Sequence, residues 1–151
     1  MENVSNELTS RLHLTQRDTV KSPSGILQEY IASLSEEDRA VLREIENSDG
    51  SKAMVVIHRG ENKGARFLIS DQASTIGRSS ESSIFLDDVT VSRKHAVIEQ
   101  TGAGYLLRDG GSLNGSYVNS ALVAEITLNS GDEIQIGKFH LLFVSGQVKK
   151  D

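Results

Sequence analysis

From Ala53 onward the sequence is a succession of short runs rich in apolar and β-branched residues, and Gly, Asn or Asp occupies the gaps between them. Apolar and polar residues alternate in Lys94–Glu99 and in Glu133–Ile136, which predicts strands with one buried and one solvated face. Runs at this close spacing are typical of an antiparallel β-sandwich, so the predicted fold class is all-β. We expect strands at Ala53–His58, Arg66–Ile69, Ser74–Gly77, Ile84–Leu86, Lys94–Gln100, Tyr105–Arg108, Ser116–Val118, Glu133–Ile136 and Phe139–Val144.

The first third of the 151-residue chain has a different character. Residues 1–50 hold ten acidic against five basic residues and two of the thirteen glycines, whereas residues 51–151 hold eleven residues of each charge and the other eleven glycines. Residues 1–25 are polar and show no apolar periodicity, a composition that does not offset the entropy of ordering. We therefore expect a flexible tail at 1–25, a helical segment with its linker at 26–50, and the sandwich domain at 51–151.

The helical segment is predicted from spacing. Its apolar residues Leu27, Tyr30, Ile31 and Leu34 recur every three or four positions, as on one face of a helix. Ser35 followed by Asp38 resembles an N-capping signal for a second helix through Val41, Leu42 and Ile45. Such an amphipathic segment packs on its own domain, frays, or docks on a partner, and spacing does not separate these alternatives.

Composition excludes several classes of protein. The chain has no Cys, so disulfide scaffolds, thiol nucleophiles and thiolate zinc sites are excluded. It has no apolar run of the roughly 20 residues that a membrane helix needs, and its start carries Glu2 where a signal peptide carries base. The near-neutral domain also lacks the basic excess of a general nucleic-acid binder. We expect a cytoplasmic protein that binds neither membranes nor nucleic acid and, without coiled-coil heptads, is a monomer.

Three polar gaps between the expected strands are the candidates for a functional site. They are residues 77–80, 87–95 and 109–116. Each alone has an ordinary explanation as a solvated loop or turn; Asn114-Gly115, for example, is a common hairpin dipeptide. Together they offer two Arg side chains, Ser hydroxyls and an Asn amide, which are the donors that a doubly charged phosphate with three acceptor oxygens requires.

These gaps also carry a family resemblance. Gly77-Arg78, Ser92-Arg93 with His95, and Ser112 with Asn114-Gly115 resemble, in order and spacing, the signature of forkhead-associated (FHA) domains, which recognise phosphothreonine through an Arg cluster. The resemblance covers roughly residues 53–144. It implies that Arg78 and Arg93 contact the phosphate, that Ser92 and Ser112 donate hydroxyl hydrogens, and that Asn114 binds the peptide backbone. It also implies structural roles for Gly77, Gly115 and His95, the last as a brace between loops.

Within this family, residues 84–93 and 131–139 are similar to one bacterial branch of small regulators of 2-oxoglutarate dehydrogenase and glutamate metabolism. The resemblance implies that the unphosphorylated protein binds and modulates these enzymes. A Ser/Thr protein kinase then phosphorylates an N-terminal Thr, and the tail occupies its own FHA site. The relatives carry a Glu-Thr-Thr-Ser motif that this tail lacks, so the candidate phosphorylation sites here are Thr19 and Thr15, unless the tail is an unphosphorylated linker.

The sequence does not predict an enzyme. The stretch from Gly131 to Lys138 has one residue too many for a phosphate-binding loop, and Phe139 stands where Ser or Thr would bind magnesium. The four His residues are scattered, and no metal site, cofactor site or catalytic triad is recognisable. Two alternatives to the regulator stay open: a generic phosphothreonine adaptor without a metabolic target, and an enzyme with an unrecognised site.

Overall fold

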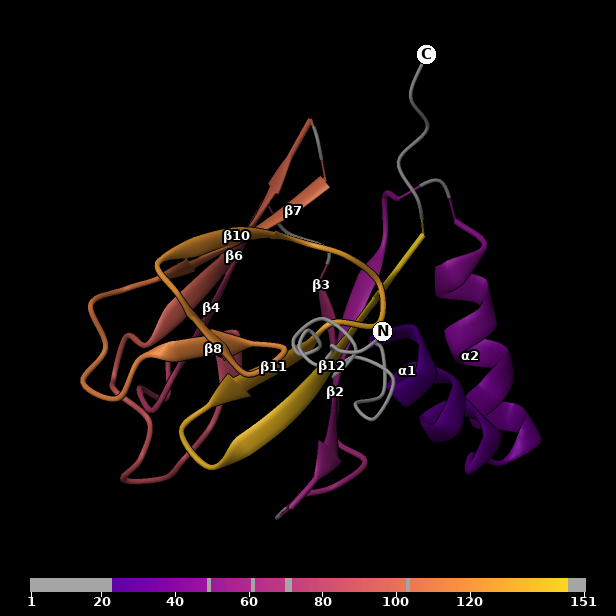
Figure 1. Ribbon diagram of the computed structural model, residues 1–151, viewed down its shortest axis with the longest axis horizontal. Coiled ribbons are helices and arrows are strands. Elements are labelled where there is room, and N and C mark those ends of the chain that lie inside the picture. Colours follow the sequence, from indigo (N-terminus) through magenta and orange to yellow (C-terminus); the bar gives the residue numbers. More distant parts are fainter. Residues whose placement is uncertain (1–22, 49, 61, 70–71, 103, 147–151) are drawn as a thin grey trace, which may run out of the picture.

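The computed structural model describes residues 23–48, 50–60, 62–69, 72–102 and 104–146 (Figure 1). The candidate phosphorylation sites Thr15 and Thr19 lie outside the described residues. Two helices precede a set of short strands. Their bounds are α1 (Pro23–Ala32), α2 (Glu36–Glu46), β2 (Ala53–Arg59), β3 (Arg66–Ile69), β4 (Ala73–Gly77), β5 (Ile84–Phe85), β6 (Ala96–Thr101), β7 (Gly104–Asp109), β8 (Ser116–Val118), β9 (Ala121–Val123), β10 (Glu125–Leu128), β11 (Glu133–Ile136) and β12 (Phe139–Ser145).

The strands form the predicted β-sandwich. One sheet has the order β10-β7-β6-β4-β5 and the other has the order β3-β2-β12-β11-β8-β9. Alternate side chains of both sheets point inward and form one core, to which Ile57, Ile98, Leu107 and Phe143 contribute fully buried side chains. One pairing departs from the expected antiparallel pattern, because β4 and β5 run parallel over two residue pairs. Residues 78–83 bring the chain back to the level of Ile76, near the end of β4, so that β5 runs in the same direction as β4.

The strands expected from the sequence are all present, with ends that differ by at most two residues. Two strands, β9 and β10, were not predicted. A two-residue turn at Asn119 and Ser120 joins β8 to β9, and both turn residues have positive φ angles, of 50° and 72°. This geometry is the hairpin turn that Asn-Gly usually signals, so Asn-Ser carried too weak a signal to be recognised.

The two helices begin close to where capping chemistry places them. Helix α1 starts at Pro23, three residues before the expected boundary, so residues 23–25 do not belong to a tail. Proline suits the first helical turn, where its missing N–H would have no partner anyway. The Ser35 hydroxyl accepts a hydrogen bond from the Asp38 N–H at 3.2 Å, which confirms the capping signal that precedes α2.

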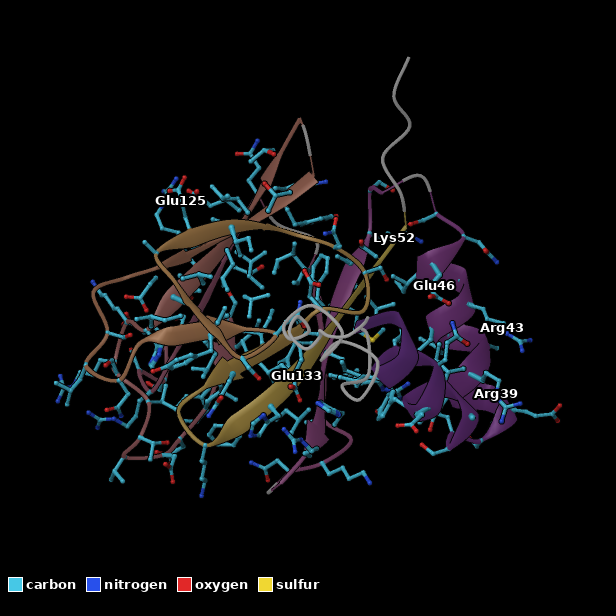
Figure 2. The ribbon with its side chains drawn as sticks, viewed as in Figure 1. Arg39, Arg43, Glu46, Lys52, Glu125 and Glu133 are labelled. Atoms are coloured by element: carbon cyan, nitrogen blue, oxygen red, sulfur yellow. The ribbon has the colours of Figure 1, made fainter. Side chains whose placement is uncertain are left out.

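Both helices pack on the outer face of the larger sheet and form a second apolar layer. The helices lie together on one side of the sandwich, and Arg43 on α2 points away from the sheets (Figure 2). The layer consists of Leu27, Tyr30, Ile31, Leu42 and Ile45 from the helices against Met54, Val56, Leu142 and Val144 from β2 and β12. Of the alternatives that the sequence left open, the structure therefore supports packing on the chain's own domain.

Beyond α1, the same sheet face carries a cluster of ionisable side chains. The Glu133 carboxylate lies 2.6 Å from His58 Nε2, 3.2 Å from Arg59 Nη2 and 3.5 Å from His140 Nδ1. The His58 ring also meets the Tyr30 ring of α1 edge to face. Burial lowers the pKa of both histidines below 6.5, and the neighbouring Arg59 lowers them further, although Glu133 acts in the opposite direction.

This cluster predicts a loss of stability in mild acid. A lowered pKa in the folded state means that the unfolded chain binds the proton more strongly, so the stability these histidines contribute is complete above about pH 6.5 and is lost as the pH falls. We expect the midpoint temperature of thermal unfolding to decrease as the pH is lowered from 7 to 5.5. The double variant His58→Gln, His140→Asn should show a smaller decrease in calorimetry. The same pH dependence in the unmodified chain and in the double variant would show that these histidines do not cause the loss of stability.

Candidate functional site

Three loops gather on the side of the sandwich away from the helices (Figure 1). They are residues 78–83 after β4, residues 86–95 after β5 and residues 110–115 after β7. Backbone hydrogen bonds join the first two loops: the Arg78 N–H donates to the Ser92 carbonyl at 3.0 Å, and the Ser79 N–H donates to the Arg93 carbonyl at 3.3 Å. The structure therefore places Arg78 beside the Ser92-Arg93 pair.

Gly77 makes this close approach possible. A Cβ atom at this position would overlap the Arg93 carbonyl oxygen and lie 3.0 Å from Ser82 Oγ. Because the obstructing atom belongs to the backbone, a larger residue would push apart the two loops that carry the arginines.

His95 connects the second loop to the third. Its side chain is fully buried, and its Nδ1 accepts a hydrogen bond from the Ser92 N–H at 3.0 Å. Nδ1 is therefore unprotonated, and the hydrogen on Nε2 is donated to the Gly115 carbonyl 2.8 Å away. A second link runs from the Leu113 N–H to Ser92 Oγ at 3.0 Å, and the Ser92 hydroxyl hydrogen has no acceptor among the described residues.

Asp109, which was not among the expected site residues, organises the third loop. Its Oδ1 accepts the hydroxyls of Ser112 and Ser116 at 2.6 and 2.7 Å, and its Oδ2 accepts the N–H groups of Gly111 and Ser112. Burial by itself would raise the pKa of Asp109, but these hydrogen bonds lower it overall. The ionised carboxylate only accepts hydrogen bonds, so the Ser112 hydroxyl, expected to point at a ligand, donates to Asp109 instead. The sequence signal for this hub was Asp109-Gly110-Gly111, a pattern of Asx turns.

Because Asp109 accepts so many hydrogen bonds from the third loop, we expect its replacement to lower the stability of the domain measurably. Asp109→Asn puts an NH₂ donor where one carboxylate oxygen now accepts hydrogen bonds, so at least one donor of the loop loses its partner. We expect a loss of about 1–3 kcal/mol in urea unfolding and amide shifts at residues 111–116. The matched control is Asp87→Asn, an exposed aspartate of the neighbouring loop. Equal effects of the two substitutions would contradict the role of Asp109.

The side chains that face solvent between these loops are mainly hydrogen-bond donors. Arg78 Nε donates to the Val91 carbonyl at 3.0 Å, which orients the guanidinium, and its terminal nitrogens make no bond within the described ranges. Arg93 is exposed, and no described residue pairs with its side chain. Asn114 is exposed as well, and its Nδ2 donates to the Thr90 carbonyl at 3.0 Å.

The Thr90 carbonyl that orients Asn114 is itself held in place by Asp88. The Asp88 carboxylate accepts the N–H and the hydroxyl of Thr90 and lies 2.9 Å from Lys138 Nζ. The hydrogen bonds from Thr90, together with Lys138, lower the pKa of Asp88 to about 2. Asp88 therefore stabilises the loop that positions Asn114.

This arrangement is chemically suited to an anion. Two exposed guanidinium groups, the Ser92 hydroxyl, whose hydrogen has no acceptor among the described residues, and the Asn114 amide lie on three loops that hydrogen bonds hold together. Arg forks match phosphate geometry. Within the part of the chain that the structure describes, no group of three or more His, Asp or Glu is placed to hold a metal ion. None of its helices is long and apolar enough to cross a membrane.

Comparison with known proteins agrees with this geometry. The FHA domain family matches residues 74–137, which contain all three loops. The oxoglutarate dehydrogenase inhibitor of Corynebacterium jeikeium is 48% identical over 102 residues, which are 68% of this chain and 71% of that protein. The glycogen accumulation regulator GarA of Mycolicibacterium smegmatis is 46% identical over 107 residues, which are 71% of this chain and 68% of that protein.

A solved structure shows the same fold. EmbR of Mycobacterium tuberculosis, in complex with a low-affinity phosphopeptide, matches with a TM-score of 0.60 and 31% identity, over 74% of this chain and 30% of EmbR. The sandwich and its three loops thus define an FHA-domain protein. The chain belongs to the FHA family that contains the oxoglutarate dehydrogenase inhibitors and the glycogen accumulation regulator GarA.

Proposed function

We propose that this chain is a phosphothreonine-binding regulatory protein whose unphosphorylated form binds and inhibits the 2-oxoglutarate dehydrogenase complex and related glutamate-metabolism enzymes. The observation that carries the proposal is the braced set of anion donors, in a chain 48% identical to an oxoglutarate dehydrogenase inhibitor. The protein acts by binding, as a cytoplasmic monomer without a cofactor, and catalyses no reaction itself.

Each site residue has a distinct role in this proposal. The terminal nitrogens of Arg78 and the side chain of Arg93 bind the phosphate oxygens, and the Ser92 hydroxyl adds a third donor. Asn114 binds the backbone of the peptide beside the phosphothreonine. Ser112 supports the loop through Asp109 and reaches the phosphate only if its hydroxyl turns away from that carboxylate.

The switch that we propose is intramolecular. A Ser/Thr protein kinase phosphorylates Thr19 or Thr15, and the phosphorylated tail then occupies the Arg78 site of its own domain and displaces the metabolic enzymes. Because the tail is tethered, its effective concentration at the site reaches the millimolar range for a short flexible linker, so a weak intrinsic affinity suffices. Phosphorylation of the tail in this way controls a distant binding face.

Chain length sets how far each candidate threonine can lie from the start of α1. Four residues separate Thr19 from Pro23 and span at most about 14 Å, whereas the eight residues from Thr15 span about 28 Å. Thr15 therefore reaches about twice as far from the start of α1 as Thr19 does.

The test is an inhibition assay with the purified 2-oxoglutarate dehydrogenase complex and the full chain. We expect the unphosphorylated protein to inhibit, and the kinase-treated protein to lose inhibition. The Thr15→Ala and Thr19→Ala variants, each treated with the kinase and checked by intact mass, identify the switch residue, because only its loss preserves inhibition. Phosphothreonine-peptide binding without any effect on the dehydrogenase would instead favour the generic adaptor.

A further inference from the structure

Asn114 and Gly115 form the one Asn-Gly dipeptide of the chain. The structure places them in the third loop directly before β8 rather than in a hairpin turn, and Gly115 alone of the two has a positive φ, of 82°. Asn114 is exposed. An Asn that precedes Gly is chemically labile, because glycine has no side chain to shield its backbone nitrogen from the neighbouring amide.

The reaction open to such a pair is deamidation. The Gly115 nitrogen attacks the side-chain carbonyl carbon of Asn114, a C–N bond forms, and the Nδ2 group leaves as ammonia with the proton that the Gly115 nitrogen gives up. Water then opens the five-membered ring. Hydrolysis of the new bond gives aspartate, and hydrolysis of the original peptide bond gives isoaspartate, in which the main chain runs through the former side chain.

Hydrogen bonds hold both reacting groups of this pair. The Gly115 N–H donates to Ser112 Oγ at 2.9 Å, and Asn114 Nδ2 donates to the Thr90 carbonyl at 3.0 Å. The Ser112 hydroxyl is fixed in turn by Asp109, 2.6 Å away. The attacking nitrogen and the amide that it attacks are therefore each bound elsewhere in the closed loop, so the reaction proceeds from an open loop.

Closure of the third loop depends on hydrogen bonds more than on apolar burial. Leu113, the large apolar residue of this loop, is 90% exposed. The loop is anchored instead by polar contacts with Asp109, Ser92 and His95. Segments with few buried apolar contacts open at a lower free energy than the core does. Loss of one anchor should therefore raise the open fraction of the loop without unfolding the sandwich.

We propose that Asn114 is a site of spontaneous deamidation, which proceeds when the third loop opens and disables the phosphothreonine site. Aspartate at this position has no donor for the Thr90 carbonyl and adds a negative charge beside the proposed phosphate site. Isoaspartate lengthens the main chain next to Gly115, whose N–H and carbonyl bind Ser112 and His95. The modification itself is independent of the proposed function, whereas its effect on binding rests on it.

The experiment is an incubation of the full chain at neutral and at mildly alkaline pH, followed by peptide mapping with mass spectrometry. Asn119 and Asn129, each followed by Ser, are the internal references. We expect Asn114 to be modified faster than either reference, but more slowly than in an isolated peptide of residues 110–117, which no loop closure protects. The rate should rise with pH, because the attacking nitrogen must lose its proton.

Ser112→Ala tests whether opening of the loop controls the rate. The substitution removes the acceptor of the Gly115 N–H and the bond to Asp109, and we expect the rate at Asn114 to rise about tenfold. The matched control is Ser83→Ala, an exposed serine of the first loop, which should leave the rate unchanged. A rate at Asn114 no higher than at the internal references would overturn the inference. An equal rise at all three residues would overturn it too, because it reports global unfolding.

Phosphothreonine-peptide titration separates this inference from the proposed function. The binding capacity of the incubated chain should fall in step with the fraction modified at Asn114, and Asn114→Asp should bind at least about tenfold more weakly than the unmodified chain. If the fresh chain binds no phosphothreonine peptide, the proposed function fails while the modification stands. If the chain modified at Asn114 binds as tightly as the fresh chain, the inferred effect on the site is overturned.

Discussion

Arg78→Ala should abolish phosphothreonine binding and leave the domain folded. The terminal nitrogens of Arg78 face solvent between the loops, so the substitution removes charge-assisted hydrogen bonds to the phosphate and little packing. Two such bonds at about 1.5–3 kcal/mol each correspond to a loss of at least about 100-fold in affinity. Calorimetric titration with a phosphothreonine peptide measures the loss, and thermal unfolding reports the fold.

Two further variants sharpen this test. Arg78→Lys should recover only part of the affinity, because an ammonium group lacks the planar fork that binds two phosphate oxygens. Arg108→Ala is the matched control, since Arg108 is an exposed arginine of β7 whose surface partners are Glu99 and Glu125. Figure 2 shows Glu125 on the side of the sandwich opposite the helices. Full affinity in Arg78→Ala would show that the phosphate site is elsewhere.

Leu42→Ala should cost the largest share of stability of any substitution in the helices. Leu42 is fully buried between α2 and the outer face of β12, and truncation of such a core leucine leaves a cavity that costs about 2–5 kcal/mol. The measurement is urea unfolding followed by circular dichroism. The control is Val41→Ala on the same helix, where the side chain is 42% exposed and the expected change is within about 0.5 kcal/mol.

Leu42→Ala also tests whether the helix layer and the three loops of the candidate site are independent of each other. The helix layer shares no described hydrogen bond with the three loops, so Leu42→Ala should keep its affinity for a phosphothreonine peptide under conditions in which it is folded. If Leu42→Ala and Val41→Ala are equally mild, α2 does not pack on the sheet as described. A loss of phosphopeptide affinity in folded Leu42→Ala would show coupling between the helices and the site.

Much of the architecture was predictable because its signals are local. Alternation along β6 and β11 marks the buried face of each strand, and Ser35 with Asp38 marks the start of α2 within four residues. Motif spacing identified the three loops, which hydrogen bonds from Arg78 to Ser92 and from Leu113 to Ser92 join in the structure. Phosphate binding by these loops stays a prediction. These features need only nearest neighbours in the chain or a known pattern, so the sequence alone determines them.

Other features were decided by contacts between distant residues. The parallel pairing of β4 with β5 depends on the path of the loop between them, and β9 depends on a turn in which Asn119 and Ser120 both adopt positive φ. The Ser112 hydroxyl was expected to face a ligand, but the carboxylate of Asp109 takes its hydrogen. A side chain with several possible partners is assigned only when the folded chain presents them together.

The two helices show most clearly what the sequence determines and what only the tertiary structure decides. The periodicity of Leu27, Tyr30 and Ile31 establishes that one face of this segment is apolar and gains free energy when it is buried. It does not say against what, because any apolar surface satisfies the same pattern. Only the tertiary structure supplies the answer, since Met54, Val56, Leu142 and Val144 form an apolar outer face on the larger sheet that would otherwise lie in water.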